Sequence, residues 1–82
     1  MYDVEFTQSS EKAFLKLPLE IQKRIKAVLE RARIRPSAHF ERLVGMDAYK
    51  LRAGNYRIIA DIQHERLIIL VIEIGHRRNI YR

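Results

Sequence analysis

The sequence has no cysteine, no tryptophan, three glycines and two prolines. Without cysteine the chain forms no disulfide, no thiolate metal site and no thiol nucleophile. The glycines are scattered, so the sequence holds no glycine-rich loop of the kind that cradles nucleotide phosphates. These absences exclude several classes of enzyme and lead us to expect a cytoplasmic protein.

Long hydrophobic segments are also missing. The longest apolar run, Leu67 to Ile72, is too short to cross a membrane, and the chain opens without a signal peptide. We therefore expect no membrane partner. The three histidines (His39, His64 and His76) lack the spacing of metal ligands, and His39 and His64 are expected on loop surfaces. The sequence predicts no metal and no other cofactor.

What the chain does have is positive charge, with a formal net charge of +6. Its 82 residues and 48% hydrophobic content predict one globular domain, residues 1–82. A domain this basic is expected to meet a polyanion or an acidic protein. Six cations lie in or just after one predicted helix, where a solvated helix face explains them as well as a binding surface does: Lys23, Arg24, Lys26, Arg31, Arg33 and Arg35.

The hydrophobic pattern predicts a strand followed by two helices. Residues 2–6 alternate apolar and acidic side chains, and Thr7 is a suitable N-cap for a helix that ends near Leu17. A second helix follows Pro18 and should pack against the first as an antiparallel pair. The expected buried stripes are Ala13, Phe14 and Leu17 in the first helix, and Ile21, Ile25, Val28, Leu29 and Ala32 in the second.

The second half of the chain predicts strands. Residues 36–47 read as a loop, residues 49–58 as a tight hairpin, and strands are expected at 56–62 and 67–74, the last one central and ended by Gly75. The expected fold is α+β, with a small four-stranded, mainly antiparallel sheet in the order β-α-α-β-β-β. The helix pair should cover one face of this sheet.

The hairpin gathers like charges on one face. With Gly54 and Asn55 as a two-residue turn, Arg52 faces Arg57 and Lys50 lies on the same side. Like charges directly opposite each other destabilise an antiparallel pair, so the cluster needs a reason. Because the apolar residues of the hairpin should face the helices, we expect the cations in solvent or in a groove. Whether Glu73 joins them depends on a strand register that the sequence leaves open.

The chain after Gly75 can fold back over this face and bring Arg77, Arg78 and Tyr81 beside the hairpin. Arginine side chains grip phosphate oxygens and stabilise developing negative charge, and a phenol stacks on a base. RNA carries its own nucleophile, the 2′-hydroxyl, so these residue types suit RNA cleavage. Candidates for proton transfer are Tyr81, Lys50, His76 and Glu73. The plainer alternative is that the cations serve solubility and protect a sheet edge.

Three segments carry a family resemblance: "ERLVGM", "YKLRAGNYRIIADI" and "VIEIGHRRNIY". Together with the opening strand and helix pair, they resemble the RelE toxins of type II toxin–antitoxin systems, within the wider RelE/ParE superfamily. The resemblance implies a metal-independent endoribonuclease (an mRNA interferase) that cuts messenger RNA in the ribosomal A site by 2′-hydroxyl attack. It also implies an acidic, RelB-like antitoxin, with operator DNA bound only through the toxin–antitoxin complex.

The resemblance also implies residue roles. Lys50 and Arg52 match the basic pair that supports proton abstraction and holds the RNA backbone, and Arg57 matches the arginine that stabilises the phosphate. Arg77 matches the arginine proposed to protonate the leaving oxygen, and Tyr81 the tyrosine that stacks on the base. Arg78 is expected to add to RNA binding.

This sequence departs from some members of the family by having Arg52 where they have lysine. Arginine stays protonated in proteins, so Arg52 can only hold the substrate. Two alternatives remain open: a ParE-like toxin that poisons DNA gyrase, and a non-catalytic module that binds an antitoxin or nucleic acid. The combination of all five residues (Lys50, Arg52, Arg57, Arg77 and Tyr81) favours RNA cleavage over gyrase poisoning.

Overall fold

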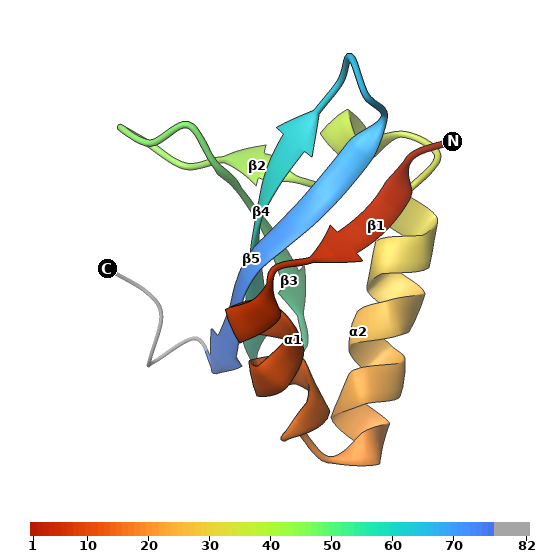
Figure 1. Ribbon diagram of the computed structural model, residues 1–82, viewed down its shortest axis with the longest axis vertical. Helices are drawn as coiled ribbons and strands as arrows, with labels where there is room; N and C mark the ends of the chain where they lie inside the picture. The colour runs from red at the N-terminus through yellow and green to blue at the C-terminus, as the bar shows by residue number, and fades with distance from the viewer. Residues whose placement is uncertain (77–82) are drawn as a thin grey trace.

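The computed structural model describes residues 1–76, and the predicted site residues Arg77, Arg78 and Tyr81 lie outside this part of the chain. Within it, one strand and two helices precede the remaining strands (Figure 1). The elements in chain order are β1 (Asp3–Phe6), α1 (Gln8–Leu15), α2 (Leu19–Ala32), a 3-10 turn η1 (Pro36–Ala38), β2 (Glu41–Arg42), β3 (Tyr49–Ala53), β4 (Tyr56–Gln63) and β5 (Ile68–His76).

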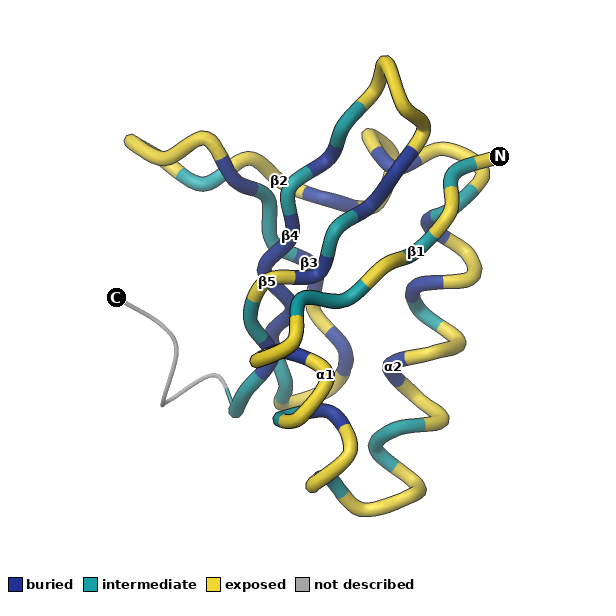
Figure 2. Tube along the Cα trace, viewed as in Figure 1, coloured by how far each residue is buried: buried dark blue, intermediate teal, exposed yellow. Residues whose placement is uncertain are grey.

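The two helices form the expected pair. The Thr7 side chain accepts a hydrogen bond from the Ser10 backbone N–H at 3.2 Å, which confirms Thr7 as the N-cap of α1. Pro18 is the N-cap residue of α2, whose buried stripe includes Ile25 and Leu29 as predicted. Figure 2 shows this stripe as dark blue segments of α2 on the side toward the sheet.

The prediction for α1 is partly wrong. The helix ends at Leu15, and it buries Ser10 together with Phe14, while Ala13 and Leu17 are only half-buried. A serine is not expected in a core, but the Ser10 hydroxyl donates a hydrogen bond to the Val71 carbonyl at 2.8 Å. Because a buried hydroxyl with a partner avoids the cost of desolvation, Ser10 can be buried where α1 meets β5.

The sheet has five strands in the order β1-β5-β4-β3-β2. β1 runs parallel to β5, and all other neighbours are antiparallel. The α+β class and the helix pair are as predicted, but the expected number of strands was wrong. The additional strand is β2, which lies in the segment predicted as a loop. A strand of two residues is too short to show the alternation on which strand prediction depends.

The β3–β4 hairpin has the predicted register, with Arg52 opposite Arg57 and Ala53 opposite Tyr56. Gly54 has φ +62°, as the first central residue of a type II′ turn requires. A Cβ at Gly54 would also lie 2.7 Å from Nη1 of Arg24, so the α2 side chain packs directly on the turn. Glycine is therefore favoured here by the backbone conformation, while the exposed Arg24 side chain could move aside for a Cβ.

The register between β4 and β5 contains a β-bulge. Ile59 pairs with Glu73 while Ala60 pairs with Val71, so Ile72 is the extra residue. The backbone N–H of Thr7 donates to the Val71 carbonyl at 3.0 Å, which anchors the start of α1 at the bulge. The bulge settles the register that the sequence left open, because it places Glu73 on the face opposite the helices.

Two expectations for β5 were wrong. Gly75 does not end the strand: it pairs with Arg57, and the strand continues to His76. β5 is central, between β1 and β4, but only its helix-facing side is fully covered, since Ile72 is 39% exposed. Apolar composition alone therefore overstated the burial of the second face.

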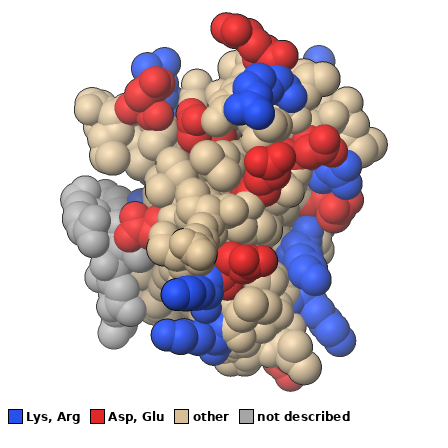
Figure 3. Space-filling view, in the orientation of Figure 1, with Lys and Arg blue, Asp and Glu red and all other residues tan. Residues whose placement is uncertain are grey.

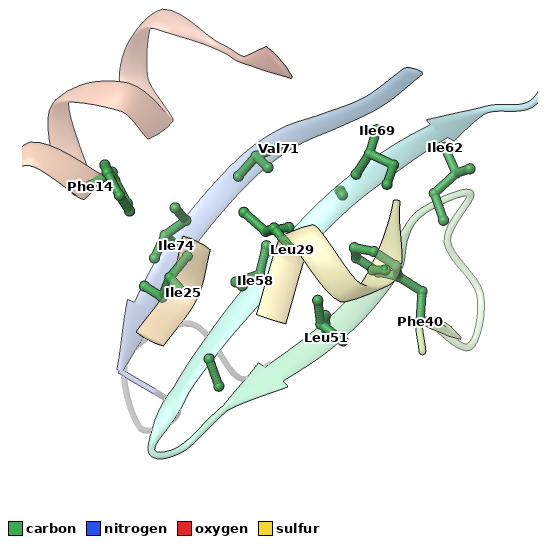
Figure 4. Close-up of a cluster of buried hydrophobic side chains, with 13 residues drawn as sticks. Phe14, Ile25, Leu29, Phe40, Leu51, Ile58, Ile62, Ile69, Val71 and Ile74 are labelled. Carbon is green, nitrogen blue, oxygen red and sulfur yellow. The ribbon is translucent and has the colours of Figure 1, made fainter. Parts of the chain in front are cut away.

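The core lies between the helices and one face of the sheet (Figure 4). α2 contributes Ile25 and Leu29, and β4 and β5 contribute Ile58, Ile69 and other buried apolar residues. Phe40, just before β2, belongs to the same cluster and is 6% exposed. None of the helices in residues 1–76 is long and apolar enough to cross a membrane.

Candidate functional site

The face of the sheet opposite the helices, here called the open face, carries two cross-strand rows of residues. One row joins Arg52 on β3, Arg57 on β4 and Gly75 on β5. The next row joins Glu41, Lys50, Ile59 and Glu73 on β2, β3, β4 and β5. Neighbouring strands lie about 4.8 Å apart, so the rows bring three cations and two carboxylates onto one surface.

A pocket of about 230 Å³ opens between these rows on the β2 side. We call it the basic pocket, and its lining residues are His39, Glu41, Lys50, Leu51, Arg52 and Arg57. Three of the predicted site residues (Lys50, Arg52 and Arg57) are thus brought together around one cavity. These three cations were expected in solvent or in a groove, and the structure places them around a pocket.

The three cations differ in their surroundings. Arg57 is buried, with 6% of its surface exposed, and it has an interaction partner. Arg52, directly opposite, is exposed, and Lys50 is half-buried. Burial of Arg57 was not predicted, since the cations were expected in solvent or in a groove. A buried guanidinium that borders a pocket is held in a fixed orientation, which suits electrostatic stabilisation of an anion.

Two pocket residues were missed as site residues. Glu41 is the Cα partner of Lys50, and its Oε1 lies 3.9 Å from the Lys50 Nζ. His39 was expected at a loop surface; it is indeed exposed, but it also lines the basic pocket. Both residues could be assigned to the site only through the pairing of β2 with β3. β2 is too short to be recognised from the sequence.

The described candidates for proton transfer do not all meet in the pocket. His76 is the register partner of Tyr56, and the two rings stack edge-on with centroids 5.5 Å apart. Tyr56 lies two residues before the core residue Ile58 on β4 and therefore shares its face of the sheet. Its partner His76 thus lies on the helix side at the end of the sheet. Glu73 lies on the open face, but it is not among the residues that line the basic pocket.

The remaining features of the surface are separate from this pocket. His64 lies in the β4–β5 turn, where its Nδ1 is 2.7 Å from the Tyr2 hydroxyl. Lys and Arg side chains also gather over the helices (Figure 3). Arg33, directly after α2, is paired with Glu30 at 3.0 Å, and the Nζ of Lys26 on α2 lies 6.0 Å from the Phe14 ring centre. Within residues 1–76, no group of three or more potential ligands is arranged to hold a metal ion.

Similar proteins share this architecture. A sequence model described as the ParE toxin of the type II toxin-antitoxin system parDE matches residues 4–81. A RelE-like toxin protein of Escherichia coli is 33% identical over 79 residues, which cover 93% of this chain and 83% of the relative. The mRNA interferase toxin RelE of E. coli strain K12 is 29% identical over 79 residues, with the same coverage of both chains.

A solved structure agrees with the sequence relatives. A chain of the intact E. coli RelBE toxin–antitoxin complex matches this fold with a TM-score of 0.79 at 28% identity, over 93% of this chain and 96% of that chain. The fold and the sequence therefore define a toxin of a type II toxin–antitoxin system. Within that class the chain belongs to the ParE toxin family, as a toxin of the RelE type.

Proposed function

We propose that this toxin is a ribosome-dependent mRNA endonuclease that cleaves by attack of the RNA 2′-hydroxyl on the adjacent phosphate. The observation that carries the proposal is that Lys50, Arg52 and Arg57 line one pocket. The positive net charge of the chain supports binding of a polyanion there. A relative that is 29% identical is named an mRNA interferase, which supports the same activity. The proposed activity requires access to ribosomes and hence a cytoplasmic location.

Each described cation has a proposed role. Arg57, held by burial, stabilises the extra negative charge on the phosphate in the transition state. Arg52, exposed and always protonated, binds the RNA backbone. Lys50, half-buried beside Arg52, orients the reacting ribose and supports loss of its 2′-proton. Positioning and charge stabilisation of this kind lower a barrier without a metal ion or a protein nucleophile.

The family resemblance supplies the roles of the residues beyond the described part of the chain. We propose that Arg77 acts at the leaving 5′-oxygen, that Tyr81 stacks on a substrate base, and that Arg78 contacts the RNA backbone. Stacking on an aromatic ring is worth about 1–3 kcal/mol per base. The same open face would bind an acidic antitoxin, since its carboxylates can take the place of RNA phosphates on the cations. Operator DNA would be bound through that complex.

The test is to map mRNA 5′ ends after in-vitro translation with the purified protein. We expect cuts within codons at the ribosomal A site, and no cuts in the same mRNA without ribosomes. Addition of the cognate antitoxin should abolish the cuts. Intact mRNA with normal translation would overturn the proposal. Because the matching family model is named for ParE, inhibition of gyrase supercoiling is the second assay, and inhibition there with intact mRNA would assign the gyrase function.

A further inference from the structure

The basic pocket contains a carboxylate and an imidazole that the cation-based account does not use. Glu41 and His39 both line the cavity, next to Lys50, Arg52 and Arg57. The geometry points to Glu41 as the group that accepts the 2′-hydroxyl proton and to His39 as the group that protonates the leaving oxygen. This inference rests on the proposed RNA cleavage and assigns its proton transfers to Glu41 and His39, so that Lys50 and Arg77 stabilise charge at these two oxygens without transferring protons.

The segment that carries both residues is firmly placed. Phe40 lies between them in sequence, and its side chain is buried in the core near Leu51 and Leu29 (Figure 4). The backbone N–H of Phe40 donates to the Pro36 carbonyl at 2.8 Å, which joins the segment to η1. Phe40 is buried, whereas His39 and Glu41 on either side of it are exposed and both line the pocket.

The other described groups are poorer choices for moving protons. Arg52 and Arg57 do not lose a proton in proteins. Lys50 is paired with a carboxylate, since its Nζ lies 3.9 Å from Oε1 of Glu41, and we assign it the role of a cation. His76 lies on the helix side of the sheet against Tyr56. Glu41 and His39 are therefore the remaining acid–base groups that line the cavity among residues 1–76.

The proposed step balances atoms and charge. Glu41 takes the proton of the 2′-hydroxyl as the 2′-oxygen bonds to phosphorus, while the bond from phosphorus to the 5′-oxygen breaks. The protonated His39 gives its proton to that 5′-oxygen. The products are a 2′,3′-cyclic phosphate and a 5′-hydroxyl end, and solvent returns a proton from Glu41 to His39. Arg52 and Arg57 hold the phosphate throughout, and general acid–base catalysis of this kind contributes about 100- to 10,000-fold.

The first experiment measures single-turnover cleavage on ribosomes with an mRNA codon in the A site, using Glu41→Gln and His39→Gln. We expect each to lower the rate constant at saturating toxin by about 100-fold or more, with a small change in the concentration needed for saturation. Matched controls are Glu65→Gln and His64→Gln, which change the same residue types in the exposed β4–β5 turn. Rates equal to wild type for the two pocket variants would overturn the inference.

The second experiment separates chemistry from positioning. Glu41 could act only by orienting Lys50, in which case Glu41→Gln would have no effect in a Lys50→Met background. We expect the loss to persist in that background. For His39, we expect free imidazole to restore part of the activity of His39→Ala. The assignment would be overturned if Glu41→Gln had no effect in the Lys50→Met background and imidazole restored no activity to His39→Ala.

The third measurement is the pH dependence of the rate. An imidazole changes charge between about pH 5 and 8, and a general acid must be protonated to act. We therefore expect the pH profile of the wild-type rate to differ from that of His39→Gln, and identical profiles would overturn the role of His39. The charged groups that line the pocket together with His39 are Glu41, Lys50, Arg52 and Arg57. Absence of any ribosome-dependent cleavage by the wild-type toxin would overturn the proposed function, and the inference with it.

Discussion

Arg57 and Arg52 are directly opposed across the β3–β4 hairpin, yet Arg57 is buried and Arg52 is exposed. The pair therefore combines a buried guanidinium with an exposed one at the edge of a single pocket. Direct opposition of like charges costs stability in the free protein. An anion in the basic pocket, whether an RNA phosphate or an antitoxin carboxylate, would remove that cost.

The two arginines should respond differently to replacement. Arg52→Met should leave the free energy of unfolding unchanged or raise it by about 0.2–1 kcal/mol, because repulsion is relieved and little packing is lost. Arg57→Met should lower it by about 1–3 kcal/mol, because groups that bind the buried guanidinium lose their partner. Both effects are measured by urea unfolding of the wild type, Arg52→Met and Arg57→Met. The comparison holds when the free energy of unfolding depends on urea concentration with the same slope in all three proteins. Equal stability of the two variants would mean that the difference in burial between Arg52 and Arg57 does not affect the free energy of unfolding.

Gly54 is expected to tolerate no side chain. Gly54→Ala combines a positive φ with a Cβ placed 2.7 Å from the Arg24 guanidinium, and we expect a loss of about 1–2 kcal/mol in stability. The double variant Gly54→Ala/Arg24→Ala removes the contact and should recover little of the loss, because the exposed Arg24 side chain can move aside and the backbone strain remains. Gly45→Ala is the control, since its φ is +77° but nothing lies within 4 Å. A Gly54→Ala protein as stable as wild type would contradict this account of the turn.

Ser10 should contribute to the attachment of α1 to the β5 bulge. Ser10→Ala deletes a buried hydrogen bond of 2.8 Å to Val71, while the Thr7 N–H still serves the same carbonyl at 3.0 Å. We therefore expect a loss near the low end for a buried hydrogen bond, about 1 kcal/mol. Ser9→Ala, at an exposed neighbouring position, should change stability by much less. Similar losses for both serines would show that the hydrogen bond to the bulge is unimportant.

The sequence predicts those features that rest on local patterns. The apolar spacing in residues 21–32 identifies α2, the Gly54-Asn55 pair identifies the hairpin register, and Thr7 identifies the start of α1. Each of these follows from a preference that a few neighbouring residues express on their own. Lys50, Arg52 and Arg57 could be grouped for the same reason, since their separation along the hairpin fixes their shared face.

The features that escaped prediction depend on contacts distant in sequence. β2 is defined by the pairing of Glu41 with Lys50, and the bulge lies where the Thr7 N–H at the start of α1 binds the Val71 carbonyl of β5. Burial of Arg57 likewise follows from packing around the sheet and not from its neighbours in the chain. His39 and Glu41 were missed because a strand of two residues shows no alternation of apolar and polar side chains from which it could be predicted.

The most direct test of the account is single-turnover cleavage of ribosome-bound mRNA by Arg57→Met, with Arg66→Met as the control for loss of one positive charge. Arg66 is exposed in the β4–β5 turn, away from the basic pocket. We expect Arg57→Met to lower the cleavage rate by about 100- to 1000-fold, the cost of removing one donor to a transition-state charge, and Arg66→Met to cleave like wild type. Wild-type cleavage by a folded Arg57→Met protein would contradict the assignment of the basic pocket as the active site.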